Sequence, residues 1–141
     1  MTPSRLVAAF MFALSTTGMV DANDGPRGIA FSYAPEQGAG VCTGPSPEDA
    51  FSCATAKCTE SGALTEDCAP VAWCFPAGWS AGIGVMHREG IHWSEFTCGW
   101  QTRDAALAAG RLRCEQMDAK MIQGCSVGVL YDPDGAEMAV E

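Results

Sequence analysis

Eight cysteines lie between residues 42 and 125 of this 141-residue chain, and no two of them form a C-x-x-C pair. Zinc ribbons and metal clusters are typically built on such close pairs, so metal ligation by these cysteines is disfavoured. An even number of cysteines in an exported chain is instead typical of a disulfide framework. The sequence therefore predicts four disulfide bonds that staple a small fold.

The N-terminal residues predict export. Arg5 precedes the apolar run 6–14, which is followed by small and polar residues, and this is the profile of a signal peptide. The run is shorter than the roughly 20 apolar residues that span a bilayer. Cleavage after Ala22 would remove the signal peptide, residues 1–22, and leave residues 23–141 as the mature protein. We therefore expect a periplasmic or secreted protein, without stable membrane insertion after cleavage.

The charge of the chain disfavours two classes of partner, and its length limits the number of domains. The chain has 17 acidic and 8 basic residues, which gives a net charge of −9. Nucleic acids and anionic membrane surfaces are therefore poor partners. The segment 23–141 has the length of one small domain, so a second domain is not expected.

The two halves of the mature chain share a pattern. Residues 28–31 (GIAF) correspond to residues 82–85 (GIGV), and each segment opens a predicted strand. Two pairs of cysteines are both separated by 16 residues, namely Cys42 with Cys58 and Cys98 with Cys114. We interpret this pattern as an internal duplication, with repeats at about residues 27–76 and 81–133.

Each repeat predicts a strand-strand-helix-strand unit. Ser46 and Thr102 are suitable N-caps for a helix that runs between the two cysteines of each repeat. The predicted strands cover residues 28–34, 38–42, 69–74, 82–87, 91–98 and 126–131. We therefore expect an α+β domain with about six strands and two helices, most simply as one sheet with both helices on one face.

These features resemble a known family. They are the GIAFS opening at 28–32, a glycine-containing hairpin, an alanine-rich helix that ends in Cys58, and a Cys68-x-x-Val71 strand, all repeated. Over about residues 27–132 the chain is similar to the domain of unknown function 4189 family, although it has extra cysteines and a long connection at 75–81. The resemblance implies a small secreted or periplasmic domain and supplies no catalytic residues.

The repeat also constrains the disulfide pairing. Cys53 and Cys74 have no counterpart in the other half, so we expect them to bond to each other. The cysteine that ends each helix is expected to bond to the cysteine that opens the next strand, and the remaining equivalent pair must then bond between the halves. The predicted disulfides are Cys42–Cys98, Cys53–Cys74, Cys58–Cys68 and Cys114–Cys125.

Two segments contain residue types that can ligate a metal ion. His87 and His92 flank a hairpin connection, with Glu89 and Glu95 nearby, and two histidines with a carboxylate would suit zinc. A solvated hairpin tip is the favoured interpretation, because ligand geometry from a single hairpin is loosely specified. The segment 132–135 (DPDG) begins like a calcium loop but continues with alanine where a ligand is needed, so it predicts a turn.

No constellation for catalysis stands out. Neither histidine lies in a Gly-x-Ser-x-Gly elbow or beside a cysteine expected to stay free, and no carboxylate pair is marked as a glycosidase dyad. We therefore predict no catalytic residues, no metal and no cofactor, and favour a protein that is not an enzyme.

Trp79 and Trp100 each follow a glycine in a predicted loop. Loop tryptophans are typical anchors for a partner, and the alternative is that they cover the ends of the core. We therefore predict an exported, non-enzymatic binding module, inhibitor-like or immunity-like, that binds a protein or cell-envelope component through Trp79 and Trp100. The alternatives are a small secreted hydrolase or metalloenzyme that uses His87 and His92, and a structural envelope protein.

Overall fold

The computed structural model describes residues 25–141, and the predicted signal peptide lies outside the described residues. The first half contains β1 (Gly28–Ala34), β2 (Gly38–Gly44), α1 (Pro47–Glu60), the short 3-10 helix η1 (Thr65–Asp67) and β3 (Ala69–Cys74). The second half contains β4 (Trp79–His87), β5 (His92–Trp100), α2 (Arg103–Glu115), β6 (Ile122–Tyr131) and β7 (Glu137–Met138). The α+β class and the strand-strand-helix-strand order of each half are as predicted.

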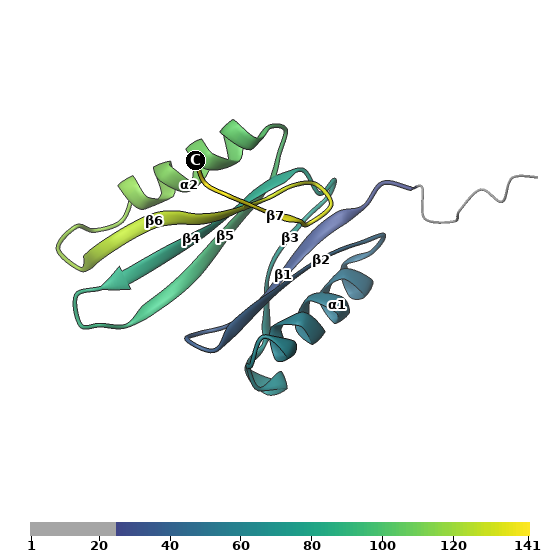
Figure 1. Cartoon of the computed structure of the whole chain (residues 1–141), viewed down its shortest axis with the longest axis horizontal. Coiled ribbons are helices and arrows are strands. Elements are labelled where there is room, and N and C mark those ends of the chain that lie inside the picture. Colours follow the sequence, from purple (N-terminus) through teal and green to yellow (C-terminus); the bar gives the residue numbers. More distant parts are fainter. Residues whose placement is uncertain (1–24) are drawn as a thin grey trace, which may run out of the picture.

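The strands form two antiparallel sheets rather than one. The first has the order β2-β1-β3 and the second has the order β5-β4-β6-β7. The helices lie on the outer sides of the two sheets, so the layers run α1, first sheet, second sheet, α2 (Figure 1). The expectation of a single sheet was wrong, because the third strand of each half pairs with the first strand of the same half. Each sheet thus covers one face with its own helix and buries the other against its counterpart.

The local signals for the helices are confirmed. Ser46 Oγ accepts a hydrogen bond from the Asp49 N–H at 3.2 Å, and Thr102 Oγ1 accepts one from the Ala105 N–H at 3.1 Å. These N-caps satisfy backbone donors that the first turn of a helix leaves free. α1 packs so closely on its sheet that a Cβ at Gly40 would collide with the backbone of Ala54, so this position requires glycine.

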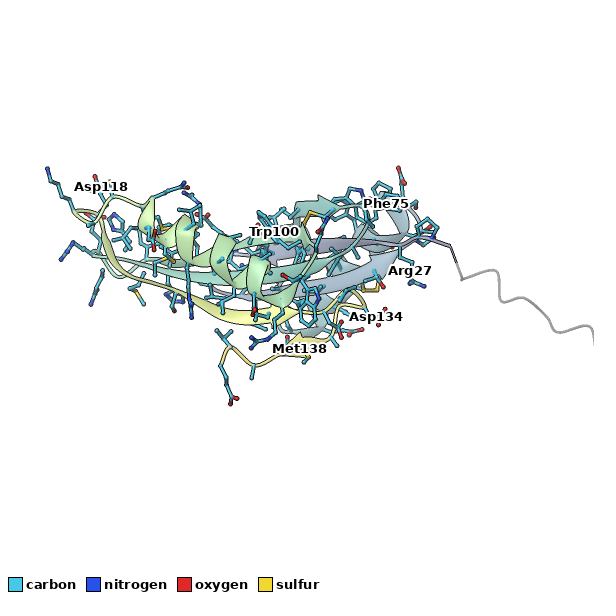
Figure 2. The ribbon with its side chains drawn as sticks, turned by 90° about the horizontal axis from the view of Figure 1, so that it is seen from above. Arg27, Phe75, Trp100, Asp118, Asp134 and Met138 are labelled. Atoms are coloured by element: carbon cyan, nitrogen blue, oxygen red, sulfur yellow. A yellow bond between two sulfur atoms is a disulfide. The ribbon has the colours of Figure 1, made fainter. Side chains whose placement is uncertain are left out.

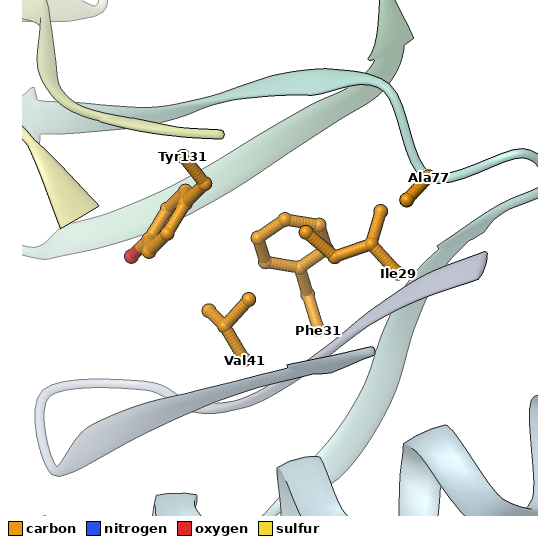
Figure 3. Packing of buried hydrophobic residues seen from close by; sticks show 5 residues of the cluster. All are labelled: Ile29, Phe31, Val41, Ala77 and Tyr131. Carbon is orange, nitrogen blue, oxygen red and sulfur yellow. The ribbon is translucent and has the colours of Figure 1, made fainter. Parts of the chain in front are cut away.

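The main core lies between the two sheets. It contains Ile29, Phe31, Val41, Ala77 and Tyr131 (Figure 3). Phe31 is fully buried and its ring lies 4.7 Å from that of Phe96 and 5.5 Å from that of Tyr131. Because side chains alternate along a strand, Ile29 and Phe31 point toward the second sheet while Ala30 points toward α1.

Four disulfides are present among the described residues: Cys42–Cys53, Cys58–Cys68, Cys74–Cys98 and Cys114–Cys125. The predicted bonds Cys58–Cys68 and Cys114–Cys125 are confirmed. Each of them ties the end of a helix to the chain at or beside the next strand of the same half. The predicted bonds Cys42–Cys98 and Cys53–Cys74 are wrong.

A β-bulge explains the two wrong pairings. In β5 the register with β4 shifts between the Trp79 and Ala81 partners, where Gly99 has a φ of 84°. Such an extra residue moves the side chains on one side of it to the opposite face of the sheet. Cys98 therefore points into the core between the sheets and bonds to Cys74, whereas Cys42 points toward α1 and bonds to Cys53. Cys42 and Cys98 have equivalent positions in the sequence, but Cys42 faces a helix and Cys98 faces the core between the sheets.

The largely buried side chain of Tyr131 gives this core a testable property. Burial, and next the negative charge of Glu137, raises the pKa of Tyr131 to about 12. A tyrosine in the unfolded chain has a pKa of about 10. The contribution of neutral Tyr131 to the free energy of unfolding is therefore fully present below that pH, and up to about 3 kcal/mol of it is lost as the pH rises to about 12. We expect the tyrosinate absorbance of the folded protein to show a late titration that Tyr131→Phe removes. An identical titration curve in the variant would contradict this assignment.

Candidate functional site

A groove of about 360 Å³ lies between α2 and β5, which is an edge strand of the second sheet. Its apolar lining includes Ile83, Trp100 and Leu112, and its polar lining includes Glu95, Thr97 and Arg113. Trp100 is the last residue of β5, shortly before α2 begins (Figure 2). We call this feature the Trp100 groove.

The bulge at Gly99 determines where Trp100 points. Beyond the bulge, Trp100 pairs with Trp79 and lies on the α2 side of the sheet, the same side as Thr97. The Trp100 Nε1–H donates to Thr97 Oγ1 at 2.8 Å, which holds the indole in one orientation. Trp100 is 37% exposed and Leu112, on the opposite wall, is 53% exposed. The groove therefore presents two apolar side chains to solvent, one of them held by a hydrogen bond.

An ion pair places two oppositely charged side chains in the groove. Arg113 Nε donates to Glu95 Oε2 at 2.6 Å and Arg113 Nη2 donates to Glu95 Oε1 at 3.1 Å. The Trp93 indole N–H also donates to Glu95 Oε1, at 3.1 Å. Partial burial raises the pKa of Glu95, but the hydrogen bonds from Arg113 and Trp93 outweigh it, so the net pKa lies below the ordinary value. The Glu95 carboxylate therefore stays charged at neutral pH and fixes the guanidinium beside Leu112.

The two predicted tryptophans are direct cross-strand neighbours on β4 and β5, but their surroundings differ. Trp79 is half-buried and packs against the cluster of Ala81, Leu107 and Leu130 beneath α2. Trp100 alone of the two lines the groove. The role of Trp79 in partner binding stays a prediction, but its packing gives this side chain a structural role.

The two histidines have different surroundings. Alternation along the β4–β5 hairpin places them on opposite faces, since His92 pairs with Met86 and His87 is the next residue of β4. His92 Nδ1 lies 3.4 Å from Glu36 Oε1, whereas His87 Nδ1 lies 3.8 Å from Glu89 Oε2. Within residues 25–141 no group of three or more His, Cys, Asp or Glu side chains is arranged to hold a metal ion. The two histidines therefore do not lie in a common site.

The segment that begins like a calcium loop forms the predicted turn. Asp132 Oδ1 accepts hydrogen bonds from the N–H groups of Asp134 and Ala136, both at 2.9 Å. Gly135 has a φ of 84°, which glycine adopts without strain. The carboxylate of Asp132 is thus used to close the turn between β6 and β7.

Sequence reasoning identified Trp100 but missed the rest of the groove. Glu95 and Arg113 are 18 residues apart on different elements, and only the packing of α2 on β5 brings them together. Leu112 carried no signal because it is a common residue on a predicted helix. An exposed leucine next to two arginines was the one local hint, since Arg111 and Arg113 flank it.

Comparison of the chain with protein-family models, with curated proteins and with solved structures gave no match. The resemblance to the domain of unknown function 4189 family therefore stays a prediction. In the described part of the chain, no helix has the length and apolar character needed to cross a membrane. The four disulfides indicate an oxidising compartment outside the cytoplasm.

Proposed function

We propose that this protein is an exported, non-enzymatic binding module of the periplasm or the cell exterior that binds a partner protein through the Trp100 groove. The observation that carries the proposal is the half-exposed indole of Trp100, held by Thr97 opposite the exposed Leu112. Binding energy in protein interfaces is concentrated in such tryptophan and arginine side chains at the centre of a packed patch.

The charges around the groove favour an acidic segment of the partner. Arg113 lines the groove, and Glu95 binds its Nε and Nη2 groups, so its Nη1 group is left for a partner. Arg111 lies on the other side of α2, facing β6, and does not line the groove. An apolar side chain of the partner would fill the space between Trp100 and Leu112, and a neighbouring carboxylate would meet the Arg113 guanidinium.

Disulfides hold the two walls of the groove in place. Cys98 ties β5 to β3 through Cys74, and Cys114 ties the C-terminal turn of α2 to β6 through Cys125. A wall that is already ordered loses less conformational entropy when a partner binds. This rigidity suits an inhibitor-like or immunity-like protein, which presents a preformed surface.

The test compares Trp100→Ala with the wild type. A protein captured from the extracytoplasmic fraction of the source cells is purified, and its Kd for each variant is measured. We expect Trp100→Ala to weaken binding by about 30-fold or more, the effect of losing about 2 kcal/mol at a hot spot. Because the side chain is partly exposed, the melting temperature should change little.

Ile91→Ala is the matched control, because Ile91 is an apolar residue, 56% exposed, at the tip of the β4–β5 hairpin. It should leave the Kd unchanged, whereas Leu112→Ala should weaken binding. If the captured protein binds Trp100→Ala and Leu112→Ala as tightly as the wild type, the groove is not the binding site. A failure to capture any protein that needs Trp100 would also count against the proposal.

A further inference from the structure

The first sheet leaves one end of the second sheet uncovered. Gly82 of β4 faces the core, since a Cβ there would meet the side chains of Val129 and Tyr131. Side chains alternate along a strand, so Gly84 and Met86 lie on the same face of the sheet as Gly82. Both residues are exposed, and the ends of β4, β5 and β6 reach beyond the β1–β2 hairpin (Figure 1). This end of the face is therefore open to solvent.

Three strands share the open face, because residues directly opposite each other in a sheet lie on the same side. Gly84 and Met86 each have one opposite residue on β5 and one on β6. These opposite residues are Ser94, His92, Ser126 and Gly124. All six residues line a hollow of about 530 Å³, a volume in the usual range of small-molecule sites. We call this feature the glycine hollow.

The two glycines of the hollow are not required by the packing of the fold. A Cβ at Gly84 would have no described atom within 4 Å apart from its chain neighbours, and a Cβ at Gly124 would meet only the Met86 Cβ, at 4.0 Å. Neither glycine has a positive φ. By contrast, a Cβ at Gly82 or Gly110 would collide with a valine side chain of β6. A glycine inside a strand weakens the strand and often marks a place where a ligand approaches the backbone closely.

The other half of the protein holds one rim of the hollow. Glu36 Oε1, from the turn between β1 and β2, lies 3.4 Å from His92 Nδ1 and accepts a hydrogen bond from the His92 N–H at 3.5 Å. Tyr33 Oη accepts a hydrogen bond from the Ser94 N–H at 2.9 Å. Glu36 has a φ of 60° and is the one non-glycine residue of 25–141 with a positive φ. Such a conformation persists where surrounding contacts hold it, so a carboxylate is fixed beside the histidine of the hollow.

The side chains of the hollow indicate the chemistry of its ligand. Met86 is 38% exposed, and a thioether makes favourable contacts with the edge of an aromatic ring. The hydroxyl groups of Ser94 and Ser126 can accept hydrogen bonds. Among the described residues that line the hollow none is lysine or arginine, whereas Glu36 places a carboxylate at the rim and the whole chain has a net charge of −9. These features favour a flat aromatic group with a positive charge.

We propose that the glycine hollow binds a small, planar aromatic cation. The ring lies on the bare backbone of Gly84 and Gly124, with its edge against Met86. The cationic group is directed toward Glu36, beside His92. The hollow lies on the face of the second sheet that is turned away from α2, whereas the Trp100 groove lies on the α2 side. The proposal therefore does not depend on the function proposed for that groove.

The probe is naphthylmethylamine, and its binding is measured by isothermal titration calorimetry. We expect saturable binding at least about fivefold tighter than that of naphthoate, which has the same ring with the opposite charge. This ratio corresponds to about 1 kcal/mol, the upper end for an exposed ion pair. Binding should shift the amide NMR signals of Gly84 and Gly124, and Glu36→Gln should reduce the preference for the amine. Trp100→Ala should bind the amine like the wild type.

Gly84→Val is the decisive variant. The space above Gly84 is open and valine suits a strand, so the melting temperature should not fall. The new side chain covers the floor of the hollow and should weaken binding of the amine at least about tenfold, or about 1.4 kcal/mol. Gly128→Val is the matched control, because Gly128 is also an exposed glycine of β6 with open space above it but does not line the hollow. It should bind the amine like the wild type.

Several results would overturn the proposal. They are the absence of binding, equally tight binding of naphthoate, and unchanged binding of the amine by Gly84→Val. An equal loss in Gly84→Val and Gly128→Val would also overturn it, because the loss would then not come from the hollow. If Gly84→Val does not fold, Gly124→Ala replaces it, since a Cβ there reaches only ordinary contact with Met86, and unchanged binding by that variant rejects the proposal.

Discussion

Replacement of Phe31 by alanine is expected to lower the free energy of unfolding by about 3 to 5 kcal/mol, the usual cost of truncating a buried aromatic side chain. Phe31 is 0% exposed and stacks on Phe96 across the interface between the sheets. The ring also meets Tyr131 edge to face (Figure 3). The cavity left by alanine would lie where the two sheets are held together, with rigid strands on both sides that limit collapse.

Denaturation in urea under non-reducing conditions measures this effect, since all four disulfides then persist in both variants. Phe75→Ala is the control of the same size. Phe75 is 53% exposed, so its truncation should cost less than about 1.5 kcal/mol. Equal losses in the two variants would show that Phe31 does not hold the core together.

Removal of the Cys74–Cys98 bond, by alanine at both positions, is expected to lower the free energy of unfolding by about 3 to 4 kcal/mol. The bonded residues are separated by 24 positions, compared with 10 or 11 for the other three disulfides. A longer closed loop restricts the unfolded chain more strongly, so this bond should contribute most. It is also the disulfide that connects the two sheets.

Removal of Cys114–Cys125 is the matched control, because this bond closes a separation of 11 residues within the second half. Its loss should cost about 3 kcal/mol or slightly less, and the difference between the two variants is the quantity to be measured by urea denaturation. A larger loss for the Cys114–Cys125 variant would contradict the expected dependence of the stabilisation on loop length.

Local chemistry was enough to predict the regular elements. The helix starts were found because Ser46 and Thr102 cap the helices through residues only three positions away. The three-residue turn after β1 and the turn before β7 were found because glycine, proline and aspartate favour turns without help from distant residues. The two-residue strand β7 was missed, since it exists only because the edge of β6 is there to pair with it.

The face on which a side chain lies depends on register, and register is a tertiary property. A spacing of 16 residues placed Cys42 and Cys98 in equivalent positions of the sequence, but the bulge at Gly99 moved Cys98 to the opposite face. The same bulge turned Trp100 toward α2 and so created the groove beside Leu112. Sequence reasoning therefore identified Trp100 without its surroundings.

By itself, the sequence determined the composition of each half: its capped helix, its hairpin, and the two disulfides that close short loops next to a helix end. These depend on contacts within about ten residues. The equally short Cys42–Cys53 loop was missed, because that bond depends on which face of β2 Cys42 occupies. Only the tertiary structure decided that the halves form two facing sheets and that Cys74 bonds to Cys98. Each of these outcomes depends on which faces are buried against each other, and a single shifted residue in a strand reverses that assignment.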